Sequence, residues 1–153
     1  MPKPGQTKKV DGVHWVGRLR KARKFLAIAR NELDLADRAD DAGPIMSNMI
    51  LAAVAYADTL TAAVGGVVNQ GEHDTVINTL RTVLGKDLPK AQETHLRMLL
   101  ARKDQVQYGA SFDPVIDAQK LAEHANAFAA WAELELARRF PEALRPTPGG
   151  GGS

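Results

Sequence analysis

Apolar residues recur every three or four positions through five long stretches of this 153-residue chain, and this spacing constrains the fold more than any other feature. It places the apolar side chains on one face of a helix, whereas a strand needs strict alternation. Long helices joined by short connections usually pack as antiparallel neighbours. The pattern therefore predicts an all-α, up-and-down bundle of about five helices. We expect these helices at about residues 15–40, 44–67, 74–84, 89–107 and 114–140.

The composition agrees with this fold class and excludes several kinds of protein. Hydrophobic residues make up 44% of the chain and aromatic residues only 5%, so alanine and leucine supply most of the apolar surface, which favours helices. The absence of cysteine excludes disulfides and thiolate metal sites. No apolar run approaches the roughly 20 residues of a membrane span, and no secretory signal is recognisable. We expect a cytoplasmic protein without a membrane partner.

The two ends of the chain differ in composition from its middle. Residues 1–12 combine prolines, glycines and lysines without an apolar period, which predicts a flexible basic arm. Residues 146–153 are rich in proline and glycine, which is typical of a flexible tail and also of artificial linkers. The predicted helical domain therefore covers residues 13–145.

The net charge of +2 conceals an uneven distribution of charge. Residues 1–30 hold nine basic side chains and one acidic side chain, a net +8, which leaves −6 for the remainder. Such a split indicates either an acidic partner or self-association through opposite charges. A phosphate-binding surface on the first helix is one interpretation, and an ordinary solvated helix face is the other. The candidate phosphate-binding residues are Arg18, Arg20, Lys21, Arg23 and Lys24.

Motifs for catalysis or metal binding are sparse. The four histidines are not paired at helical spacing, so the sequence predicts no metal site. We interpret His14 and His124 as surface groups, His73 as part of a helix cap and His95 as a packing residue. No phosphate-binding loop or serine nucleophile motif is present, and no cofactor is expected.

Asp58 is the most unusual carboxylate, because it directly follows the apolar run at residues 52–57. A buried carboxylate needs a partner, since an unpaired buried charge is costly. Arg102 is the candidate partner. Such a pair would be either a structural ion pair or part of a polar cleft.

Three stretches of the chain, taken in order, resemble the HEPN superfamily. They are AVAYADTL at residues 53–60, GEHD at 71–74 and LLARKDQVQYG at 99–109. The likeness is to the short bacterial members that stand alone, and it covers about residues 16–140. It implies a helical bundle that commonly dimerises, in a family where many members are metal-independent endoribonucleases.

The ribonuclease signature of that family is an arginine, often followed by a polar residue, with a histidine four to six intervening positions later. Arg102 matches the arginine and Lys103 the polar residue, but Gln107, Tyr108 and Gly109 occupy the positions open to the histidine. A tyrosine, with an ordinary pKa near 10, is a poor base at pH 7. The resemblance implies Arg102 and Tyr108 as candidate catalytic residues and a polar cleft of Asp58, Arg102, Lys103, Asp104 and Tyr108.

We therefore expect a non-catalytic or weakly catalytic HEPN-like homodimer that binds RNA, a nucleotide or a partner protein. The family setting would be toxin–antitoxin, defence or stress, with a nucleotidyltransferase-type partner. One alternative is a metal-independent endoribonuclease toxin that uses Arg102 and Tyr108. The other is a structural oligomerisation module assembled by the charge split.

Overall fold

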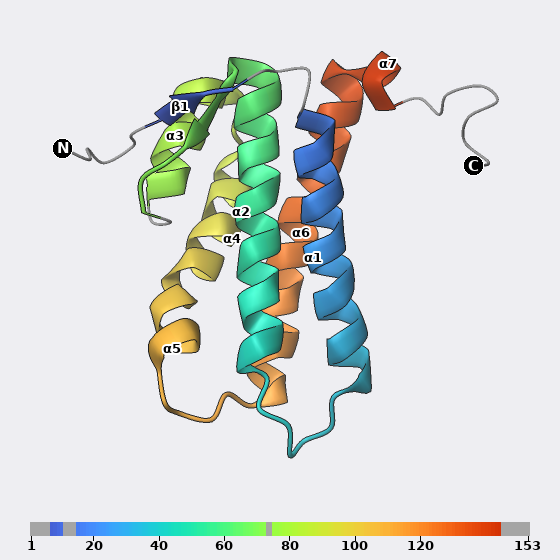
Figure 1. Ribbon diagram of the computed structural model, residues 1–153, viewed down its shortest axis with the longest axis vertical. Helices are drawn as coiled ribbons and strands as arrows, with labels where there is room; N and C mark the ends of the chain where they lie inside the picture. The colour runs from blue at the N-terminus through green and yellow to red at the C-terminus, as the bar shows by residue number, and fades with distance from the viewer. Residues whose placement is uncertain (1–6, 11–14, 73–74, 145–153) are drawn as a thin grey trace.

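A computed structural model describes residues 7–10, 15–72 and 75–144, and within these ranges the protein is a helical bundle with one small sheet. The prediction of a helical bundle is confirmed. Figure 1 shows α1 and α4 on opposite sides of α2, with α6 behind them. The long helices are α1 (Trp15–Leu35), α2 (Gly43–Gly65), α4 (Lys90–Ala101) and α6 (Val115–Arg139). Shorter helices are α3 (Val76–Leu84), α5 (Lys103–Tyr108) and α7 (Pro141–Leu144), with a 3-10 turn at Gly85–Asp87.

Helix α2 lies at the centre of the bundle, where it packs most extensively on α1 and also on α6, α3 and α5. Pro44 suits its first turn, and Gly66 ends it with a left-handed φ of 66° and an N–H donated to the Ala62 carbonyl at 3.0 Å. By length and composition α2 is apolar enough to cross a membrane, but 67% of its most apolar window is buried inside the bundle. Packing against the neighbouring helices therefore accounts for its apolar sequence.

The core is built mainly from alanine and leucine. The buried residues of α1 and of α6 recur mostly every three or four positions, as the apolar spacing of the sequence predicts for one face of a helix. Because alanine side chains are small, the helix axes can approach closely and few aromatic residues are needed. The buried residues of α1 are Trp15, Leu19, Ala22, Leu26 and Ala29. Those of α6 are Ala118, Leu121, Ala125, Phe128, Ala129, Ala132 and Leu136.

Two helices differ from their predicted bounds. α1 ends at Leu35 rather than near residue 40, because the carboxylates of Asp37 and Asp40 accept hydrogen bonds from backbone N–H groups and form a turn. The single helix expected at residues 89–107 is instead broken at Arg102 into α4 and α5. The break brings α5 against α2, where Val106 lies near the first residues of that helix.

Part of the predicted flexible arm forms a strand. β1 (Thr7–Lys9) pairs antiparallel with β2 (Val67–Asn69), with Lys8 opposite Val68. The N–H of Val10 then donates to the Gly66 carbonyl at 2.9 Å. The prediction of a flexible arm is therefore wrong for residues 7–9, because the extended segment after α2 offers backbone groups that need partners. The other arm residues, 1–6 and 11–12, and the predicted tail at 146–153 lie outside the described residues.

Candidate functional site

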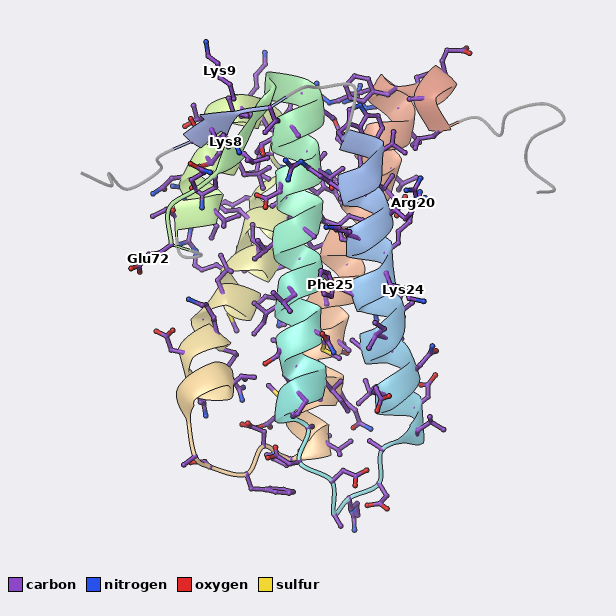
Figure 2. All side chains as sticks on the ribbon, in the orientation of Figure 1. Lys8, Lys9, Arg20, Lys24, Phe25 and Glu72 are labelled. Atoms are coloured by element: carbon purple, nitrogen blue, oxygen red, sulfur yellow. The ribbon has the colours of Figure 1, made fainter. Side chains whose placement is uncertain are left out.

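Basic side chains from two separate elements line one groove, which we call the cationic groove. It lies between β1 and the first half of α1 and has a volume of about 690 Å³. Figure 2 shows Lys8 and Lys9 on the strand and Arg20 and Lys24 on the helix. The strand thus adds two lysines that the sequence analysis did not assign to the basic surface of α1. The lining residues are Lys8, Lys9, Val10, Gly17, Arg18, Arg20 and Lys21.

The basic surface continues along α1 beyond the groove. A shallow hollow of about 490 Å³ adjoins it, and its walls are almost entirely the apolar stems of basic side chains around Ala27. Of the exposed basic residues that line these two hollows, five make no ion pair with any carboxylate in the part of the chain that the structure describes. We call Lys8, Lys9, Arg20, Lys21 and Lys24 the unpaired cations.

Arg23 differs from the unpaired cations because it is held by Glu133 of α6. Its Nε and Nη2 atoms donate to the two carboxylate oxygens at 2.7 and 2.6 Å, and the Tyr56 hydroxyl of α2 donates to the same carboxylate at 2.9 Å. The bonds from Arg23 keep the pKa of Glu133 below its usual value. The pKa of Tyr56 is raised mainly by burial, and the hydrogen bond to Glu133 raises it further. Arg23 therefore belongs to a network that joins three helices. The sequence analysis identified neither Glu133 nor Tyr56 as a member of this network.

Asp58 lies on α2 within electrostatic reach of Arg18 on α1. Burial raises the pKa of Asp58 to about 6, and the positive charge of Arg18 opposes this rise. The expected pair with Arg102 is wrong. Helix α5, which follows Arg102, lies beside Asn48 near the start of α2, and Asp58 is ten residues further along α2, or about 15 Å of helix.

Arg102 is instead paired with α6. One of its terminal nitrogens lies 3.5 Å from Asp117 Oδ2, and its buried Nε has no partner among the described residues. Lys103 Nζ lies 3.9 Å from Asp104 Oδ1. Tyr108 ends α5, but its side chain lies outside the described part of the structure. The predicted polar cleft is therefore divided: Arg102, Lys103 and Asp104 cluster at the α4–α5 junction, and Asp58 lies well away from them.

The structure also brings together two histidines that we interpreted separately. His95 of α4 and His124 of α6 are both half-buried, and their Nδ1 atoms are 2.9 Å apart. The interpretation of His124 as an ordinary surface group is therefore wrong. The same antiparallel register of the two helices accounts for both contacts. Arg102 lies seven residues, or two helical turns, after His95, and its partner Asp117 lies seven residues before His124. The predictions for His14 and His73 lie outside the described residues.

Within the described ranges, the structure assembles neither a cluster of metal ligands nor a neighbouring arginine and histidine like those of the ribonuclease signature. No group of three or more His, Cys, Asp or Glu side chains there is placed to hold a metal ion. The imidazole of His95 belongs to a residue about 10 Å along the helix axis from Arg102. No family model and no curated protein matches the sequence.

Proposed function

We propose that this protein is a non-catalytic, HEPN-like domain that binds RNA along the cationic groove. The observation that carries the proposal is that β1 and α1 place five unpaired cations on one continuous surface. Lysine and arginine side chains in such an arrangement bind phosphates by releasing condensed counterions. Contacts of this kind position a nucleic acid without reading its bases.

The surroundings of the groove favour recognition of the phosphate backbone over base stacking. Among the described residues, no aromatic side chain lines either hollow. Trp15 is buried against Phe140, with ring centroids 5.3 Å apart, and Phe25 is half-buried against the core. Proteins that stack unpaired bases present aromatic rings to them. We therefore expect low sequence specificity and a strong dependence on salt.

We expect no RNA cleavage because of the positions of Arg102 and Tyr108. RNA cleavage without a metal needs a group that exchanges protons near neutral pH. Arg102 is engaged by Asp117, and Tyr108 stands where the family signature has histidine. A homodimer and a nucleotidyltransferase-type partner in a toxin–antitoxin setting follow from the family resemblance and belong to the same proposal.

The test is fluorescence anisotropy with a labelled, unstructured RNA of about 20 nucleotides, titrated at salt concentrations from about 50 to 200 mM. If all five unpaired cations contact phosphates, log K should fall with log salt at a slope of about −3.5. Replacing four of them, Lys8, Lys9, Lys21 and Lys24, with glutamine should reduce that slope by about 3.

The matched control replaces four exposed basic residues elsewhere, Arg38, Lys86, Lys90 and Lys120, with glutamine. It should leave the affinity almost unchanged. An equal loss in both variants would show that RNA is held by net charge rather than by the groove. RNA cleavage that disappears in Arg102→Ala would favour the endoribonuclease alternative. An oligomer that salt dissociates, with no RNA binding at any salt, would favour the oligomerisation module.

A further inference from the structure

The outer face of α1 is exposed to solvent. The helix packs on α2 and, much less, on α6, and Figure 1 shows it at one edge of the bundle. Six exposed residues on this face recur at alternating steps of four and three residues, the spacing at which two helices pack along a seam. The six residues are Gly17, Lys21, Lys24, Ile28, Asn31 and Leu35. The face is therefore suited to contact a second helix.

The charges on α1 are separated along the helix axis. Its first half carries the unpaired cations Arg20, Lys21 and Lys24. Its last turn carries Glu32 and Asp34, which are exposed and make no ion pair among the described residues. The negative end of the helix dipole lies at this last turn, so carboxylates there lower the stability of the helix. The stability of α1 alone does not account for this pattern, whereas an oppositely directed copy of the helix would compensate the charges of both halves.

The shape of the same helix is also complementary to itself. The shallow hollow of about 490 Å³ lies in its first half, where the apolar stems of basic side chains surround Ala27. Leu35, at the other end, is 82% exposed. It lies eight residues beyond Ala27, or about 12 Å of helix, so it cannot fill the hollow of its own chain. The outer face of α1 thus carries an exposed apolar side chain in one half and an apolar hollow in the other.

We propose that this face of α1 binds the same face of a second copy of the chain, with the two helices antiparallel and a twofold axis close to Ile28. Such an axis lies about midway between Leu35 and the middle of the hollow, so Leu35 of each copy fills the hollow of the other. The same rotation places the acidic last turn of one helix beside the basic first half of the other. An interface of this kind is isologous and closes as a dimer.

This dimer rests on the charges and the shape of α1, and it gives a defined surface to the homodimer of the proposed function. Lys21 and Lys24 belong both to this surface and to the unpaired cations. A second copy and RNA would therefore compete for these two lysines, a consequence that rests on the proposed function. Lys8 and Lys9 lie on β1 and are not part of the dimer face.

Sedimentation equilibrium of the full-length chain without RNA measures the dimer, at protein concentrations up to about 200 μM. We expect a dimer at about 50 mM salt and a dimer weaker by at least about tenfold at about 1 M salt, because salt screens exposed charges. Leu35→Asn removes the apolar side chain from an exposed position without altering charge, and it should weaken the dimer by at least about tenfold. A chain that stays monomeric at low salt overturns the proposal.

Charge reversal identifies the surface. Arg20→Glu/Lys21→Glu/Lys24→Glu makes the outer face of α1 acidic in both halves, and Glu32→Lys/Asp34→Lys makes it basic in both halves. Each variant alone should be monomeric, because like charges then face each other across the interface. An equimolar mixture of the two variants should form a heterodimer, because the acidic face of one then meets the basic face of the other.

The matched control reverses exposed charges elsewhere, with Lys86→Glu/Lys90→Glu/Lys120→Glu, and should dimerise as the unaltered chain does. Reversal variants of α1 that still dimerise alone would overturn the proposal, as would a control that loses the dimer equally. A dimer that binds no RNA at any salt would support this inference and contradict the proposed function. RNA binding by a chain that is monomeric at low salt would do the reverse.

Discussion

At the scale of single residues, Asp58 is the clearest case in which burial opposes charge. Its pKa in the folded protein is about 6, above the ordinary 3.8, because burial disfavours the carboxylate more than Arg18 stabilises it. The folded state therefore binds this proton more tightly than the unfolded state does. The resulting stabilisation is fully present below about pH 4 and is lost as the pH rises through 6.

We expect Asp58→Asn to stabilise the protein at neutral pH, because asparagine occupies the same space without a charge to desolvate. The free energy of unfolding should increase by about 2–3 kcal/mol at pH about 7.5, with little gain at pH about 4. Urea denaturation at the two pH values measures the difference. Asp34→Asn, at an exposed carboxylate of α1, is the control and should change little at either pH. An equal gain at both pH values would contradict this account of Asp58.

At the scale of elements, the Tyr56–Glu133–Arg23 network fixes three helices to one another. The Tyr56 hydroxyl is buried on α2, Glu133 comes from α6, and Arg23 comes from α1. A hydrogen bond to a charged partner contributes more than one between neutral groups. The half-exposed Arg23 contributes less than its close bidentate geometry suggests, because solvent screens its charge.

We expect Tyr56→Phe to lower the free energy of unfolding by about 1–2 kcal/mol, because Glu133 loses a donor. In a Glu133→Ala background, the same change should cost almost nothing, since the hydroxyl then has no carboxylate to bind. A double-mutant cycle by chemical denaturation measures this coupling. Additive effects of the two substitutions would show that the hydroxyl and the carboxylate do not act together.

At the scale of the whole molecule, burial is distributed very unevenly. Helix α2 has packed neighbours along most of its length, whereas β1 is an exposed strand that pairs only with β2 among the described elements. Backbone amides exchange slowly where opening requires unfolding of the core and quickly where a few surface bonds suffice. Hydrogen exchange should therefore be slowest in α2 and fastest in β1. Comparable protection in both would contradict the division into core and attached strand.

The sequence could predict features that depend on local spacing, and it could not predict contacts between segments that are far apart in the chain. The recurrence of apolar residues predicted that the first helix buries one face, and Trp15, Leu19 and Ala22 are on that face. This spacing is local, so it needs no knowledge of other helices. The partner of Asp58 and the His95–His124 contact depend on which helices are neighbours and in what register they pack. A single sequence does not contain that information in local form. β1 was missed for the same reason, since its partner strand lies about sixty residues away.

Lys8 and Lys9, two of the five unpaired cations, are held in place only by β1, which is three residues long. The peptide bond after Lys9 follows an exposed lysine, the type of bond that trypsin cleaves. A single nick there would detach Lys8 and Lys9 and leave the helical packing intact. Limited digestion would thus yield a shortened helical bundle that stays folded but lacks the two lysines on one side of the cationic groove.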